Sequence, residues 1–164
     1  MPKLTIKKGT VIFANAPEIR AAVEFALLKG QDKFYMRTKP GEIMGYLAYG
    51  HPFLDGNGRT IMTVHSVLAQ RAGFSIDWPA TTKDAYLDAL TKEIENPAKG
   101  HLDAYLKPFM CDAIACEHLA TAIVRAPGLD GSVQNAELNE VLGASEEPGV
   151  KAQYEAMLAK RERT

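Results

Sequence analysis

The stretch that most constrains the fold is residues 51–59, His-Pro-Phe-Leu-Asp-Gly-Asn-Gly-Arg, which separates two helical patterns. Gly56 and Gly58 lack a Cβ, so the backbone there can turn sharply and bring its N–H groups against a phosphate. The pattern over 41–49 leads into this stretch, and the pattern over 58–71 leaves it. We therefore expect a tight anion-binding loop between two helices, with the positive N-terminus of the second helix behind it.

Three side chains of this loop add chemistry that glycine cannot supply. A histidine titrates near neutrality, so His51 can accept a proton from an attacking hydroxyl. Asp55 offers the hard carboxylate oxygen that Mg²⁺ prefers, and Arg59 is a cation that can hold a phosphate. Together these residues predict the transfer of a phosphate-containing group.

The loop resembles the signature of the Fic family (Fic/Doc, Fido), His-x-Phe-x-Asp/Glu-Gly-Asn-Gly-Arg-x-x-Arg, and it fits every position through Arg59. The best-known members are protein adenylyltransferases (AMPylators), which transfer AMP from ATP to a hydroxyl of a target protein. The resemblance implies a Ser, Thr or Tyr acceptor, ATP as co-substrate and Mg²⁺ as cofactor. It also implies His51 as the general base and Asp55 as the metal ligand.

The same resemblance assigns the remaining loop residues to nucleotide binding. Phe53 would be a hydrophobic anchor that pins the loop to the core, and Arg59 would bind the phosphate chain. The anion hole would be formed by Gly56, Asn57 and Gly58. Phosphorylating relatives such as Doc usually have Ala and often Lys at the two glycine positions, so the glycines favour nucleotide transfer. Phosphoryl or phosphocholine transfer on the same loop is an alternative.

Met62 departs from the signature, because the family usually has a second arginine at this position. In the family that arginine reaches the γ-phosphate of ATP, and in autoinhibited members it pairs with a glutamate of an inhibitory helix. A thioether makes no charge-assisted contact, so the triphosphate loses about 1.5–3 kcal/mol of binding unless another cation replaces it. The use of ATP as donor is therefore less secure than the transfer chemistry.

Residues 4–13 contain alternating and β-branched residues around Lys-Lys-Gly, which predicts a short β-hairpin. In the family a hairpin flap before the loop holds the target by strand addition, so that its hydroxyl faces the catalytic histidine. By the resemblance, Thr10, Val11 and Ile12 would dock the target through main-chain pairing. The alternative is a hairpin that only covers the core.

Further helical patterns cover 16–28, which Gly30 should close, and 82–95 and 101–124. We expect an all-α fold, namely a Fic-like helical bundle with a small β-hairpin flap. The Fic-like catalytic domain should comprise residues 1–124. Residues 125–164 should form a C-terminal loop and a charged helix, whose apolar positions favour docking on this domain over docking on a partner.

Composition excludes several classes of protein. The 19 basic and 20 acidic residues form no basic stripe, so no nucleic acid is required. No apolar run is long enough for a membrane span, so we expect a cytoplasmic protein that acts at no membrane. The family analogy adds toxin or effector behaviour, with delivery into another cell left open. Cys111 and Cys116 lie five residues apart in a helical pattern, which favours buried reduced thiols over a disulfide.

Two partners are implied by the resemblance: a target protein with a hydroxyl acceptor, and an inhibitory protein of the antitoxin kind. Residues 91–96, Thr-Lys-Glu-Ile-Glu-Asn, fit the short inhibitory pattern of autoinhibited relatives. This pattern fixes few positions and falls in a core helix after the loop, so we interpret it as a coincidence. A nucleotide-binding regulatory module with little activity is the alternative function, because Met62 leaves the site incomplete.

Overall fold

The computed structural model describes residues 5–8, 11–53, 56–126 and 140–142. It has helices α1 (Ala16–Gln31), α2 (Lys33–Thr38), α3 (Pro40–Gly50), α4 (Asn57–Arg71), α5 (Lys83–Glu95), α6 (His101–Leu106) and α7 (Cys116–Val124). Two 3₁₀ turns are η1 (Trp78–Ala80) and η2 (Lys107–Phe109). The strands are β1 (Thr5–Lys8), β2 (Val11–Ile12), β3 (Phe74–Ile76), β4 (Met110–Asp112) and β5 (Glu140–Leu142). The expected all-α fold with a small β flap is confirmed.

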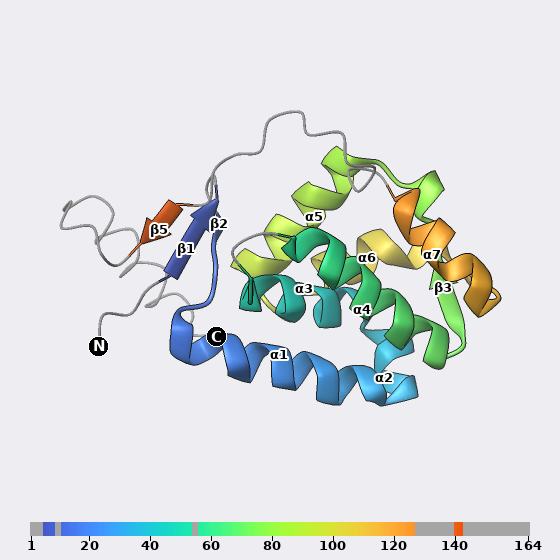
Figure 1. The fold of residues 1–164 in the computed structure, drawn as a ribbon, viewed down its shortest axis with the longest axis horizontal. Helices are drawn as coiled ribbons and strands as arrows, with labels where there is room; N and C mark the ends of the chain where they lie inside the picture. The colour runs from blue at the N-terminus through green and yellow to red at the C-terminus, as the bar shows by residue number, and fades with distance from the viewer. Residues whose placement is uncertain (1–4, 9–10, 54–55, 127–139, 143–164) are drawn as a thin grey trace.

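Helix α3 is the centre of the bundle and packs against α1, α4, α5 and α6 (Figure 1). Glu42 is its only charged residue, and nearly all of its residues are buried. Its core residues Ile43 and Met44 have no exposed surface, and they pack with Leu102 and Leu106 of α6. The loop that follows α3 therefore starts from the most rigid part of the molecule.

The N-terminus of α3 is capped by a residue distant in sequence. Lys39 at the N-cap makes no side-chain cap, and Asp103 of α6 takes this role. Its Oδ1 accepts hydrogen bonds from the backbone N–H groups of Gly41 (2.7 Å) and Glu42 (3.3 Å). This bond requires close packing, because a Cβ on Gly41 would lie 2.2 Å from the backbone nitrogen of Asp103. The cap fixes α3 against α6.

Helix α1 begins at a capping box, in which the Asn15 side chain accepts from the Glu18 N–H and the Glu18 side chain accepts from the Asn15 N–H. The Glu18 carboxylate also accepts a 2.7 Å bond from the Tyr49 hydroxyl near the end of α3. One residue earlier, the Ala14 N–H donates to the Tyr49 carbonyl at 2.9 Å. These bonds fix the segment after the flap beside the last turn of α3.

Strands β1 and β2 form the expected hairpin, with Lys7 opposite Ile12 and Lys8 opposite Val11. The other edge of β1 pairs antiparallel with β5, so the strand order is β2-β1-β5 (Figure 1). The three residues of β5 come from the C-terminal segment, and this part of it pairs with the chain's own flap. The proposed helix near the C-terminus and residues 1–4 lie outside the described residues.

The prediction of helix throughout 101–124 was wrong, because the segment divides into α6, η2, β4 and α7. Pro108 interrupts the helical pattern, and Met110–Asp112 then pairs with Phe74–Ile76 as a two-stranded ribbon. Cys111 on β4 and Cys116 at the start of α7 are both exposed, so the expectation of buried thiols was also wrong. Both cysteines are free, as expected.

The prediction that Gly30 closes α1 was wrong, because the helix continues to Gln31. Gly30 is buried, and a Cβ there would lie 2.6 Å from Leu68 Cδ1, so this glycine allows α1 to approach α4. The short helix α2, which the pattern did not predict, starts after the N-cap Asp32, whose side chain accepts from the Tyr35 N–H.

Residues 91–96 lie on and just after core helix α5, as expected for a coincidental match. Glu93 is 2% exposed and accepts from the N–H groups of Ala98 and Leu102, and its burial raises the pKa of its carboxyl group. Both carboxylate oxygens of Glu93 therefore bond backbone groups at the junction of α5 and α6.

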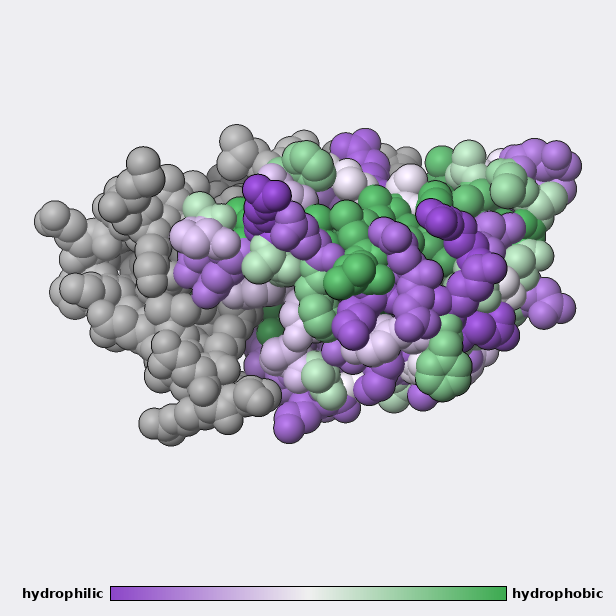
Figure 2. Space-filling view, turned by 90° about the horizontal axis from the view of Figure 1, so that it is seen from below, coloured by the Kyte–Doolittle hydropathy of each residue, from purple (hydrophilic) through white to green (hydrophobic). Residues whose placement is uncertain are grey.

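The outer face of α1 and α2 carries exposed apolar side chains, including Leu27, Leu28 and Phe34. Figure 2 shows this face, on which hydrophobic residues interrupt a largely hydrophilic surface. Among the helices of the described residues, none combines the length and apolar character of a membrane span.

Candidate active site

His51 is the C-cap of α3 and adopts a left-handed conformation, with φ 39° and ψ 56°. Histidine is one of the few side chains found repeatedly in this region of backbone space, and its N–H still donates to the Ala48 carbonyl at 3.2 Å. The preceding Gly50 is enclosed, because a Cβ there would lie 2.9 Å from Val23 of α1. The end of α3 is therefore fixed by its own backbone hydrogen bond and by its contact with α1. It orients the His51 imidazole toward the flap.

The imidazole of His51 stacks on the Phe13 ring, with centroids 4.0 Å apart and planes 26° apart. The residue is 9% exposed, and its Nε2 has no hydrogen-bond partner within the described part of the chain. Burial, and then the positive charge of Lys8, lower the pKa of His51 to about 4. The ring is therefore neutral at pH 7, with a nitrogen that is free to accept a proton.

The loop after His51 is braced by Asn57, which is 6% exposed. Its Oδ1 accepts from the Phe53 N–H at 3.0 Å, and its Nδ2 donates to the Phe53 carbonyl. The expectation that the Phe53 ring anchors the loop in the core was wrong, since this residue is 51% exposed. The backbone of Phe53 is held instead, because both polar atoms of the Asn57 side chain are directed at it.

Replacing Asn57 by Ala should slow transfer about 100-fold and destabilise the fold by about 1–2 kcal/mol, because two partly buried backbone groups lose their partner. Labelling rates and thermal melts check this. Thr63→Ala is the control, because Thr63 also lies on α4 and its hydroxyl bonds only the helix's own carbonyl of Arg59. If Asn57→Ala labels protein as fast as Thr63→Ala, then the bonds from Asn57 to the Phe53 backbone are not needed for the reaction.

Gly56 is the N-cap of α4 and has φ 75°, a conformation that favours glycine. Apart from its two neighbours in the chain, no atom of the described residues lies within 4 Å of the position a Cβ would occupy, so the described side of this turn is open. The first turn of α4 contains no acidic residue and no side-chain cap, and Gly58 and Arg59 are exposed there. This helix end can accept an anion.

Of four further expected site residues, two lie outside the described residues and two lie in the flap. Asp55 and Thr10 lie outside the described residues, so their assignments stay predictions. Val11 is partly buried and Ile12 is 7% exposed, in the flap strand next to the site. Within the described ranges, no group of three or more His, Cys, Asp or Glu side chains could hold a metal.

Met62 is 3% exposed and belongs to the hydrophobic core. Its side chain therefore packs inside the bundle, and it supplies no charge to the phosphate site. The position where the family usually has a second arginine contributes packing in this chain.

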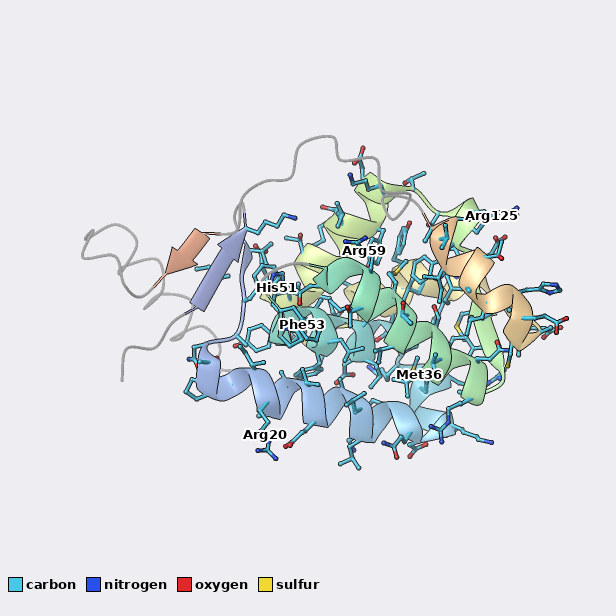
Figure 3. The ribbon with its side chains drawn as sticks, in the orientation of Figure 1. Arg20, Met36, His51, Phe53, Arg59 and Arg125 are labelled. Atoms are coloured by element: carbon cyan, nitrogen blue, oxygen red, sulfur yellow. The ribbon has the colours of Figure 1, made fainter. Side chains whose placement is uncertain are left out.

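Lys8 is a residue near the site that sequence reasoning did not single out. It is exposed on β1, and its charge acts on the pKa of His51. The predicted hairpin could have placed Lys8 near the site, because Lys8 lies opposite Val11 across the two strands. Figure 3 shows His51 beside the flap and Arg59 at the start of α4.

Comparison with known proteins supports the resemblance. Residues 3–69 match the model of the Fic/DOC family. The chain carries a Fic/DOC segment. This Fic/DOC segment begins at the flap, includes α1, α2, α3 and the 51–59 loop, and ends within α4. The family resemblance inferred from the loop is confirmed over these residues.

A protein adenylyltransferase, VbhT of Bartonella schoenbuchensis, is 43% identical to the chain over 70 residues. The match covers 42% of this chain and 15% of VbhT, so the chain spans only a small part of that relative.

Proposed function

We propose that the protein transfers AMP from ATP to a Ser, Thr or Tyr hydroxyl of a target protein. The observation that carries this proposal is the neutral His51 imidazole, whose Nε2 has no partner among the described residues, on the loop that leads to the turn at Gly56. A proton acceptor and an anion-binding helix end follow one another on this single loop. The Fic/DOC segment and the similarity to an adenylyltransferase support the same activity.

In the proposed reaction the target oxygen attacks the α-phosphorus of ATP. The new bond joins that oxygen to phosphorus, the bond to the α–β bridging oxygen breaks, and pyrophosphate leaves with the electron pair. His51 accepts the hydroxyl proton as the oxygen attacks. A pKa of about 4 makes the free imidazole a weak base, and the negative charge of bound phosphates should raise that value toward the working pH.

The phosphates would bind at the start of α4, where the N–H groups of the first turn have no intrahelical acceptor. Arg59 would hold the leaving pyrophosphate, and it is exposed in that turn. Asn57 would act through its backbone and through its brace on Phe53, because its side-chain amide is already bonded. With these roles, oriented hydrogen-bond donors would face the phosphate oxygens on which negative charge develops in the transition state.

Asp55 would hold Mg²⁺ in this account. A single carboxylate suits this ion, which usually keeps phosphate oxygens and waters as its other ligands, and the open space at Gly56 fits a metal–phosphate complex. When bound, the ion would neutralise charge on the phosphate oxygens.

The target would dock on the flap at the outer edge of β2. The hairpin has one other edge, that of β1, and β5 of the same chain already pairs with that edge. Main-chain pairing at Val11 and Ile12, and at Thr10, would direct the target hydroxyl toward His51. An inhibitory protein of the antitoxin kind would act on this site without the arginine pair, because position 62 is a buried methionine.

The test incubates the protein with a cell lysate and ATP labelled at either the α- or the γ-phosphorus. We expect the α label on protein and no γ label. Transfer of the γ label would instead favour phosphoryl transfer. Binding of ATP without transfer of either label to any lysate protein would favour a regulatory nucleotide-binding module.

A further inference from the structure

We propose that Lys8 of the flap binds the β- and γ-phosphates of the nucleoside triphosphate, in place of the arginine that position 62 lacks. This inference rests on the proposed function, because it assigns a residue to the donor's phosphate tail. It makes the flap part of the nucleotide site as well as a docking strand. Three observations carry it.

The first observation is the register of the hairpin. Lys8 lies directly opposite Val11, and cross-strand partners in an antiparallel pair project to the same face. Strand β2 ends at Ile12, and Phe13 follows it directly in the chain. The Phe13 ring stacks on His51 at 4.0 Å. Lys8 therefore lies across the hairpin from Val11, and Val11 is two residues before the Phe13 ring that covers the catalytic histidine.

The second observation is that the ammonium group of Lys8 is available. Lys8 is exposed, and no hydrogen bond or ion pair is recorded between it and any residue in the described part of the chain. Its charge nevertheless lowers the pKa of His51, so the two groups interact electrostatically. A cation beside a catalytic base opposes protonation of that base, unless an anion is bound between or beside them.

The third observation is the place of the other cations. Arg59 is exposed in the first turn of α4 and Lys8 is exposed on the flap, while the buried Met62 contributes no charge. A triphosphate at the start of α4 would therefore meet Arg59 from the helix side and Lys8 from the flap side. Two cations on opposite sides can contact different phosphates of one chain.

The test measures nucleotide binding by calorimetry, using AMP and an ATP analogue with a methylene bridge between the α- and β-phosphorus atoms. Lys8→Met should weaken binding of the analogue about tenfold and change AMP binding less than about twofold. Lys8→Arg should restore analogue binding. The matched control is Lys33→Met, at an exposed lysine of α2 far from the loop, which should bind as the wild type does.

A second readout needs no nucleotide. In an NMR titration, Lys8→Met should raise the pKa of His51, because a neighbouring positive charge is removed, and Lys33→Met should leave it unchanged. An unchanged His51 pKa in Lys8→Met overturns the placement of the ammonium group beside the site.

The outcomes separate this inference from the proposed function. If the wild type binds neither nucleotide, the proposed function fails and the role of Lys8 fails with it. If the wild type binds the analogue and Lys8→Met binds it equally well, only the role of Lys8 fails. Equal weakening for AMP and the analogue also contradicts the assignment, because Lys8 would then act at the α-phosphate or on the flap itself.

Discussion

Replacing His51 by Ala should lower the rate of AMP transfer by about 10²–10⁴-fold, the usual contribution of a positioned general base. The buried imidazole is neutral, and within the described residues its Nε2 has no partner, so a hydrogen bond from a substrate hydroxyl would satisfy it. Nucleotide binding should persist, because the start of α4 is unchanged. Transfer rates with labelled ATP, together with calorimetry on the same variant, measure the two effects separately.

Loss of structure is distinguished from loss of the base by a second variant. His51→Asn also removes the base, but asparagine tolerates the left-handed backbone at this position. Both variants should be equally inactive, whereas only His51→Ala should lose additional stability. The control is His118→Ala, at an exposed histidine of α7, which should transfer normally. Transfer at the wild-type rate by His51→Asn would remove His51 from the proposed mechanism.

Replacing Gly41 by Ala should destabilise the fold by about 3 kcal/mol or more, because overpacking here acts on backbone and not on a flexible side chain. A Cβ would lie 2.2 Å from the Asp103 nitrogen and 2.3 Å from the Leu102 carbonyl carbon. The new methyl group would push α3 away from α6 and break the 2.7 Å bond from the Gly41 N–H to Asp103. Helix propensity alone would predict a gain of about 1 kcal/mol for this substitution.

Gly45→Ala is the matched comparison on the same helix. A Cβ there would lie 2.7 Å from Glu93 Cγ, which is a side-chain atom, so the neighbour can shift more cheaply than a backbone can. We expect a loss of about 1–2 kcal/mol. Chemical denaturation of both variants measures the ranking. Equal losses at Gly41 and Gly45 would show that the α3–α6 contact does not hold this end of the bundle as tightly as described.

Much of the unit around the loop is predictable from local pattern. The helix before His51, the helix from Asn57 and the hairpin near the N-terminus each have a periodicity or turn signal within a short stretch of chain. The glycine at position 56 indicates the left-handed turn that the structure has at φ 75°. Local signals suffice there because each element is determined mainly by its own residues.

Other features depend on residues far apart in the chain. Asp103 caps α3 from α6, and the ribbon of β3 and β4 forms only because Phe74–Ile76 meets Met110–Asp112. The exposed ring of Phe53 was also not predictable, since the Asn57 side chain holds its backbone in place of a core contact. Single-sequence patterns carry no information on such pairings, because propensity reports local preference and not tertiary partners.

The central claim is attack on the α-phosphorus of ATP, and the fate of that atom tests it most directly. Wild-type protein incubated with ATP and lysate should attach the α-phosphorus label, and not the γ label, to a protein hydroxyl. His51→Asn should attach neither above background. Attachment of the γ label, or attachment of the α label at the same rate by His51→Asn, would contradict the account.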